Sequence, residues 1–376
     1  MPEAFPPCIQ SGIVLPASLL VPCWVPHMRQ FVSFPSIWTQ DAFPVCSPSI
    51  RLLCRQPGRG PVSMLRRYDG FVLHFVHILK ELPMSTIEKI SSGPLSAAID
   101  SHGAQLMSLA LDGTEYLWQR DPKWWPRCAP ILFPIVGVLR NGFATSEQGD
   151  IHLSRHGLAR NMEHSVAKKD SSSVTFHVES TDETKKCFPY DWVLEMTYAA
   201  DGEKLSQTYT VKNPGKVTLP FTLGGHPAFN VPVAGTDESF EDYELRFAAP
   251  WDIETAAIDT EGLEDFSQMS SLGTSDTLPL THGLFERYLT LTLHDVPENR
   301  VQLFGKKSGH GIELSFDGFP YLGVWSAEND APFVAVEPWV GVAAAKDETD
   351  EFEKKRGMLF LEPGEELSRT FTIRPF

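Results

Sequence analysis

Short runs of β-branched and aromatic residues recur from Ile87 to the C-terminus, and this pattern limits the possible folds more than any other feature of the sequence. One run, Leu205–Lys212 (LSQTYTVK), alternates apolar and polar residues as a half-buried strand does. Asn213-Pro214-Gly215 ends that run with a turn, because Pro presets φ and Gly accepts a positive φ. Long amphipathic helical stretches are missing, so we predict an all-β sandwich or barrel. The other predicted strands are Val174–Val178, Val193–Tyr198, Tyr243–Phe247, Leu289–Leu293, Val301–Phe304, Ile312–Phe316, Leu322–Trp325, Phe333–Val336, Met358–Leu361 and Leu367–Ile373.

Composition argues against two classes of partner. The 376 residues carry a net charge of −16, whereas proteins that bind nucleic acids or anionic membranes present a basic surface. The run nearest to a membrane span, Ile13–Val25, is interrupted by Pro16 and Pro22 and is shorter than the roughly 20 residues required. We predict a neutral small molecule as the ligand, with no nucleic acid and no membrane as partner.

Residues 1–83 differ from the rest of the chain. They carry a net charge of +3 and 12 of the 30 prolines, which leaves −19 for residues 84–376. We predict a Pro- and Cys-containing N-terminal extension of low order, or a mispredicted start with Met84 opening the domain 84–376. Because Met1–Phe5 holds no Lys or Arg, we expect no secretory signal and a cytoplasmic protein.

Three segments place a titratable side chain among apolar residues and glycines. Glu337 follows an apolar run and precedes Pro338, so we expect the strand to end there. The three segments are Ser154–Arg160 (SRHGLAR) with His156, Leu223–Asn230 (LGGHPAFN) with His226, and Phe333–Ala343 (FVAVEPWVGVA) with Glu337.

Each of these residues also has an ordinary structural interpretation. His226 fits a histidine satisfied inside the core, His156 a surface histidine between two arginines, and Glu337 a buried salt bridge. Pro227 favours an extended His226, which fixes the direction of its ring. The cluster Trp118, Trp124 and Trp125 suits packing as well as stacking on a sugar. No nucleotide-binding, serine-hydrolase or metal-binding motif is found, so we predict no metal.

Further segments occur in a fixed order around these three. They are Ile99–Ala110 (IDSHGAQLMSLA), Tyr116-Leu117-Trp118, Pro130–Gly137 (PILFPIVG), Phe319–Trp325 (FPYLGVW) and Leu361–Glu365 (LEPGE). With HGLAR, GGHPAF and VEPWVG, residues 84–376 resemble a full-length member of the aldose 1-epimerase family, particularly of its shorter branch.

The resemblance implies a galactose-mutarotase-like β-supersandwich of twisted antiparallel sheets with few short helices. It also implies interconversion of the α and β anomers of an aldose without a cofactor, by a monomer or a weak homodimer. Glu337 would be the general base and His226 the general acid. The implied substrate-binding residues are His156, Arg140, Glu286 and Trp339.

Two of these residues stand in for family positions that this chain lacks. The shorter branch usually has an arginine where this chain has Val138, and Arg140 lies two positions later. Glu286 is the acidic residue in a segment, Leu284–Leu289, where the resemblance leads us to expect an aspartate.

Three other functions compete with this one. A non-catalytic sugar-binding module would bind an aldose in the same cleft without interconverting its anomers. A hexose-phosphate epimerase is favoured by Arg155 and Arg160, which flank His156 and suit a phosphate. An Fe(II) site of two histidines and one carboxylate would use His156, His226 and Glu337.

Overall fold

The computed structural model of this protein describes residues 85–376 and, before them, only four strands of two residues each. These four strands form two antiparallel pairs, β1 with β2 and β3 with β4. The chain divides into two compact units, one made of Gln10–Met84 and one that contains Ser85–Phe376. The predictions for residues 1–83, an extension of low order or a start at Met84, lie outside the described residues. The four strands are β1 (Val21–Pro22), β2 (Phe31–Val32), β3 (Leu53–Cys54) and β4 (Val62–Ser63).

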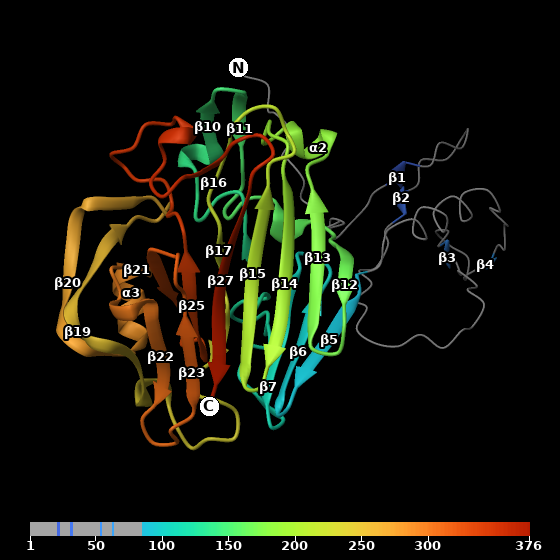
Figure 1. Cartoon of the computed structure of the whole chain (residues 1–376). Coiled ribbons are helices and arrows are strands. Elements are labelled where there is room, and N and C mark those ends of the chain that lie inside the picture. Colours follow the sequence, from blue (N-terminus) through green and yellow to red (C-terminus); the bar gives the residue numbers. More distant parts are fainter. Residues whose placement is uncertain (1–20, 23–30, 33–52, 55–61, 64–84) are drawn as a thin grey trace. The chain divides into compact units, whose positions relative to one another are not determined.

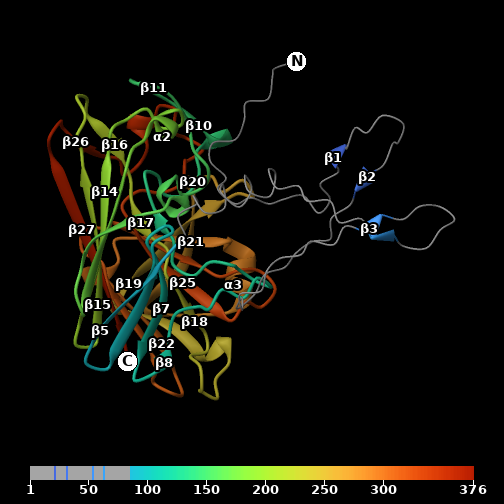
Figure 2. The ribbon, with the colours of Figure 1, turned by 90° about the vertical axis from the view of Figure 1, so that its right-hand side faces the viewer.

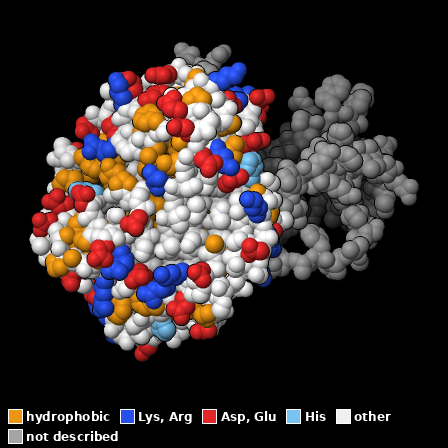
Figure 3. Space-filling view, in the orientation of Figure 1, with side chains coloured by type: hydrophobic (Ala, Val, Ile, Leu, Met, Phe, Trp, Pro, Cys, Tyr) orange, Lys and Arg blue, Asp and Glu red, His pale blue; other side chains and the backbone are white. Residues whose placement is uncertain are grey.

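The largest element is a nine-stranded antiparallel sheet (Figure 1). Its strand β15 buries every second side chain, whereas Thr208 and Thr210 face outward and hydrogen-bond to hydroxyls of β27. The prediction of a half-buried strand there is confirmed, and few charged side chains lie over β15 and β27 in Figure 3. In order across the sheet, the strands are β12 (Ser165–Lys169), β13 (Ser173–Glu179), β14 (Val193–Asp201), β15 (Lys204–Lys212), β27 (Glu366–Pro375), β23 (Gly311–Ser315), β22 (Arg300–Gly305), β19 (Tyr243–Ile258) and β20 (Glu264–Pro279).

Two smaller antiparallel sheets and two strand pairs complete the β-structure. The six-stranded sheet contains β21 (Thr290–His294), β24 (Tyr321–Trp325), β25 (Phe333–Trp339), β17 (Gly224–Gly225) and β9 (Ile131–Leu132), with β18 (Ala228–Asn230) also paired to β25. The four-stranded sheet contains β5 (Ile87–Ser92), β6 (Leu95–Asp100), β7 (Gln105–Leu111) and β8 (Thr114–Glu115). The pairs are β10 (Phe143–Ser146) with β11 (Gly149–His152) and β16 (Leu219–Phe221) with β26 (Leu359–Leu361).

Buried tyrosines connect the nine-stranded sheet to both smaller sheets. The hydroxyl of Tyr209 on β15 donates to the carbonyl of Gly224 at 2.7 Å, and that of Tyr198 on β14 donates to the carbonyl of Ala104 at 2.6 Å. The layers are so close at β17 that a Cβ on Gly225 would lie 2.7 Å from the ring of Phe371 on β27. Figure 2 shows this stacking from the side, with β27, β15 and β14 along one edge.

Helices are few and short, and with the sheets they confirm the all-β prediction. Thr181 and Thr281 cap α2 and α3 by accepting backbone N–H groups. Among the described residues no helix has the length and apolar character needed to cross a bilayer. The helices are α2 (Asp182–Lys185), α3 (His282–Tyr288) and the 3-10 turns η1 (Arg140–Gly142), η2 (Ala159–Asn161), η3 (Phe240–Asp242), η4 (Pro297–Asn299) and η5 (Phe352–Lys354).

The acidic run 346–355 looks in sequence like a solvated helix or loop, but part of it is buried. Lys355 is only 5% exposed, and its Nζ lies 3.6 Å from a carboxylate oxygen of Glu348. Glu264 at the start of β20 is 1% exposed and accepts a hydrogen bond from Thr292 at 3.1 Å. Burial raises the pKa of Glu264 to about 7 and lowers that of Lys355.

Glu264→Gln should therefore increase stability at alkaline pH. A carboxyl whose pKa is raised on folding lowers stability as the pH rises from its ordinary value of 4.5 to its folded value of about 7. We expect the gain in the free energy of unfolding to grow from under about 1 kcal/mol at pH 5 to as much as about 3 kcal/mol at pH 8.5. Urea denaturation at both pH values measures it, with Glu203→Gln in the exposed β14–β15 turn as control. A gain that does not depend on pH would contradict the expectation.

Candidate active site

Glu337 and Trp339 lie on the face of the six-stranded sheet that points away from the nine-stranded sheet. Successive side chains of a strand point to opposite faces. A Cβ on Gly224 would lie 2.8 Å from the indole of Trp339, whereas one on Gly225 would meet Phe371 of the nine-stranded sheet. Glu337 shares its face with Trp339, two residues along β25. The carboxyl of Glu337 therefore projects from the face of the six-stranded sheet that points away from the nine-stranded sheet.

The prediction that the strand ends at Glu337 is wrong. β25 continues to Trp339 and pairs with β24 over its last residues, with Glu337 opposite Gly323 and Pro338 opposite Leu322. On the other side, the amide of Val336 donates to Pro227 and that of Val340 to Leu223. Pro338, which has no N–H, falls between these two bonds, at the break between β17 and β18. The strand thus tolerates its proline because the neighbouring strand is interrupted there.

His226 occupies this interruption between β17 and β18. Its backbone N–H donates to the carbonyl of Pro130 at 3.1 Å, which holds the residue on the β9 side of the sheet. The residue is 8% exposed, and its ring Nδ1 is buried without a hydrogen-bond partner among the described residues. The other ring nitrogen, Nε2, lies 3.3 Å from Oε1 of Glu337. Residues 111 positions apart in sequence thus come into direct contact.

His156 reaches the same place from the turn after β11. It has a left-handed backbone, with φ of 65°, and Gly157 follows with φ of 75°. Two bonds to Gly137 hold it: the His156 N–H donates to the Gly137 carbonyl at 2.7 Å, and the Gly137 N–H donates to Nδ1 of His156 at 3.1 Å. Because Nδ1 accepts a hydrogen bond, the neutral ring carries its proton on Nε2 and can only donate from there.

Aromatic rings surround His226. His156 stands at 89° to it with ring centroids 5.5 Å apart, Trp125 stacks on it at 4.9 Å, and Trp325 meets it edge-on at 5.6 Å. Of the tryptophan cluster singled out from sequence, Trp125 thus contacts the candidate site. Trp118 is instead buried in the core and donates its indole N–H to the carbonyl of Trp125.

Burial favours the uncharged forms of these groups. It raises the pKa of Glu337 well above its ordinary value, partly opposed by the Trp339 hydrogen bond and the charge of Arg155. It lowers the pKa of His226, and that of His156, far below the ordinary value. The charge of a neighbouring carboxylate by itself favours a cationic His226. In the site without a ligand, desolvation outweighs that attraction, so the neutral pair is favoured.

Three arginines lie close enough to the histidines to affect their pKa values. The positive charges of Arg160, Arg155 and Arg127 all act on His226 and further lower its pKa. In the described part of the chain, none of the three forms an ion pair with a carboxylate. Sequence reasoning singled out Arg155 and Arg160 but missed Arg127 and Trp325. Trp325 shares a face of β24 with Tyr321, but the pairing that sets it beside His226 cannot be read from sequence.

Two predicted substrate-binding residues are not among the contacts of this site. The guanidinium of Arg140 donates to the carbonyls of Ala345, Lys346 and Glu348 and pairs with Asp350. Glu286 is exposed on α3. Their role in binding a sugar remains a prediction.

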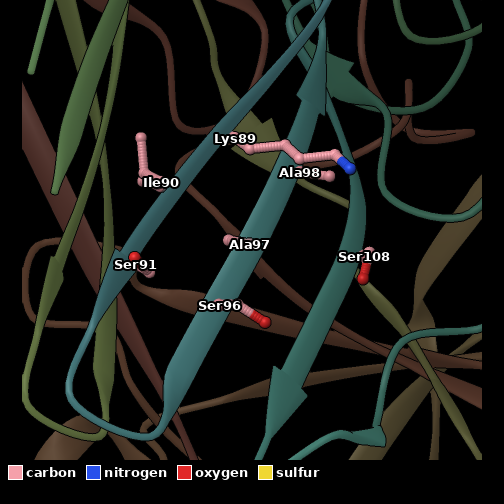
Figure 4. A pocket seen from close by; sticks show the side chains of 7 residues that line it. All are labelled: Lys89, Ile90, Ser91, Ser96, Ala97, Ala98 and Ser108. Carbon is pink, nitrogen blue, oxygen red and sulfur yellow. The ribbon is translucent and has the colours of Figure 1, made fainter. Parts of the chain in front are cut away.

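None of the candidate site residues lines the hollow over β5, β6 and β7. The polar side chains that line it include Lys89, Ser96 and Ser108, without a paired acid and base (Figure 4). Within the described residues, no group of three or more His, Cys, Asp or Glu is arranged to hold a metal ion.

Comparison with known proteins identifies the family. A model of the aldose 1-epimerase family matches residues 87–374. The chain belongs to the aldose 1-epimerase family. Protein LacX (chromosomal) of Lactococcus lactis subsp. lactis is 33% identical over 291 residues, which cover 74% of this chain and 96% of LacX.

Solved structures of relatives share the fold. A galactose mutarotase related enzyme from Lactobacillus acidophilus is 28% identical with a TM-score of 0.73, covering 77% of this chain and 97% of its own. A galactose mutarotase-like protein from Lactobacillus casei is 32% identical with a TM-score of 0.71, covering 77% of this chain and 100% of its own. The predicted galactose-mutarotase-like fold is confirmed, and family membership supports a mutarotase-like, sugar-binding enzyme.

Proposed function

We propose that this chain interconverts the α and β anomers of an aldose, with Glu337 as general base and His226 as general acid. The contact that carries the proposal is the 3.3 Å between Nε2 of His226 and Oε1 of Glu337, both of which are buried. Mutarotation needs one group that takes a proton and one that gives a proton. The sugar is released with the same oxidation state, so the reaction calls for no redox cofactor.

The reaction begins from the ion pair of the two residues, which forms when the neutral pair passes its proton from Oε1 of Glu337 to Nε2 of His226. Oε1 of Glu337 takes the proton of the anomeric O1 hydroxyl while Nε2–H of His226 gives its proton to the ring oxygen O5. The C1–O5 bond breaks, C1=O1 forms, and the open-chain aldehyde rotates about C1–C2. The same transfers in reverse close the ring on the other face.

Burial of Glu337 and His226 changes the relative stability of the stages of this reaction. Ring opening converts the carboxylate and the imidazolium into a carboxylic acid and a neutral imidazole, with the same total number of protons. Because burial favours the neutral pair, it favours the open-chain stage over the closed rings. His156, a fixed donor at Nε2, is suited to hydrogen-bond the sugar oxygen. The indole rings of Trp125 and Trp325 offer surfaces on which the C–H face of the sugar can stack.

Polarimetry of freshly dissolved α-glucose and α-galactose tests the proposal. Added protein should accelerate the approach of optical rotation to equilibrium, in proportion to its concentration. Calorimetric binding of a sugar without acceleration would instead indicate a non-catalytic sugar-binding module.

A second candidate, a hexose-phosphate epimerase, is favoured by the arginines that lack carboxylate partners. Arg155 also lines a hollow of about 290 Å³ with Val138, Ser154 and Glu261, large enough for a phosphate group. This candidate predicts that kcat/KM for glucose 6-phosphate exceeds that for glucose by about tenfold or more. Arg155→Met should then remove the preference and leave kcat/KM for glucose within about twofold. Equal kcat/KM for the two sugars in the wild type would exclude it.

A further inference from the structure

The two oxygens of the Glu337 carboxyl have different partners. Oε1 faces Nε2 of His226 at 3.3 Å, and Oε2 accepts a hydrogen bond from the indole Nε1–H of Trp339 at 3.2 Å. Residues two apart on a strand share a face, so the backbone of β25 itself places the indole beside the carboxyl. One oxygen is thereby engaged by the protein, and the other faces the histidine.

The indole that makes this bond is held by the strands on both sides. A Cβ on Gly323 of β24 would lie 2.2 Å from Cζ2 of Trp339, and one on Gly224 of β17 would lie 2.8 Å from its Cδ1. The ring therefore crosses both neighbouring strands at glycines, where no side chain competes for the space. It packs with Leu132 and Val342 in a small apolar cluster. A ring fixed in this way holds its N–H in one direction.

The indole N–H of Trp339, the only hydrogen-bonding group of its side chain, is not free for a ligand. The residue is 5% exposed, in contrast to the half-buried Trp125 and Trp325 next to His226. A sugar contact, the role that the family resemblance implied for Trp339, would use this N–H to bind a sugar oxygen. The indole N–H, however, is already bonded to Glu337.

We infer that Trp339 is a positioning residue, whose N–H holds Oε2 of Glu337 so that Oε1 is the oxygen that exchanges the proton with O1 of the sugar. The inference rests on the proposed function for its catalytic part. A proton on Oε2 would point at the indole N–H and break the bond, so the bond directs the proton to Oε1. A hydrogen bond to the ionised form also favours the carboxylate, which burial disfavours.

Trp339→Phe tests the role, because it removes the N–H and keeps an apolar ring. We expect kcat to fall about 10- to 100-fold with KM changed by less than about twofold, and the acid limb of the pH profile to move up by about one pH unit. The other groups that act on the carboxyl, His226 with His156 behind it and Arg155, stay in place. Trp251→Phe is the matched control, since its indole N–H is buried without a partner among the described residues.

A second measurement needs no activity and uses the full chain. The indole N–H proton resonance of Trp339 is identified by its loss in Trp339→Phe, and it should shift in Glu337→Ala, which removes the acceptor. If the resonance shifts but the protein is inactive on every aldose, the contact between Trp339 and Glu337 is supported and the proposed function fails. An unshifted resonance would overturn the inference. So would a Trp339→Phe enzyme with raised KM and an unmoved acid limb, because that is the behaviour of a sugar contact.

Discussion

Glu337→Gln should slow enzymatic mutarotation by about 10²–10⁴-fold, the range that one positioned proton transfer supplies. An amide cannot take the O1 proton, but its oxygen can still accept the Trp339 N–H at the place of Oε2. Burial already favours an uncharged group at this position, so the substitution should not lower the melting temperature. Polarimetry or magnetisation transfer between the anomeric protons measures the rate.

The control for this substitution is the same chemical change at an exposed site. Glu203→Gln in the β14–β15 turn should leave the rate within about twofold of the wild type. If Glu337→Gln kept wild-type turnover of an aldose that the wild type anomerises, Glu337 would not be the base. If both enzymes were inactive on a panel of neutral and phosphorylated aldoses, the mutarotase proposal itself would fail.

Gly157→Ala should destabilise the protein by about 3 kcal/mol or more, one of the largest losses expected from adding a single methyl group. Gly157 has φ of 75°, and a Cβ there would lie 2.3 Å from the carbonyl oxygen of Phe133. This clash is with backbone, which cannot rotate away as a side chain can. Relaxation would move the turn that carries His156, so loss of sugar binding should accompany the loss of stability.

Gly202→Ala separates the backbone conformation from the steric clash. Gly202 also has a positive φ, of 59°, but no atom lies within 4 Å of the position of its Cβ. It should cost only about 1 kcal/mol, the strain of a non-glycine residue in that conformation. Urea denaturation of both variants gives the two free energies. Equal losses would show that the close approach of Gly157 to Phe133 is not tight in solution.

Much of the fold is predictable because strand formation depends on local patterns. The alternation in Leu205–Lys212 shows which side chains are buried on β15, and all eleven predicted strands overlap strands of the structure. The burial of the acidic run 346–355 is less predictable. Its many charges suggest that it is exposed to solvent. In the structure, however, Lys355 is buried beside Glu348 and near Glu264, which lies more than 80 positions earlier in the chain. Local composition carries no information about such a distant partner.

The candidate site, like the fold, is predictable from sequence only where the signal is local. His156, His226 and Glu337 are recognisable as titratable groups among glycines and apolar residues, and the structure brings them together. Arg140 and Glu286 lie near positions where the family resemblance implies an arginine and an aspartate, but Arg140 contacts the segment 345–350 and Glu286 is exposed. Arg127 was missed because its relation to His226 arises only through packing.

The sequence by itself determined the all-β class, the turns, and the identity of the acid/base candidates, because periodicity, turn chemistry and titratable side chains are local properties. Only the tertiary structure decided that Glu337 lies within β25 rather than at its end, since the break between β17 and β18 accommodates Pro338. It also decided the directions in which the pKa values of Glu337 and His226 shift, and the division of the Glu337 oxygens between His226 and Trp339. These depend on burial and on distances between strands, which are fixed only when the sheets pack.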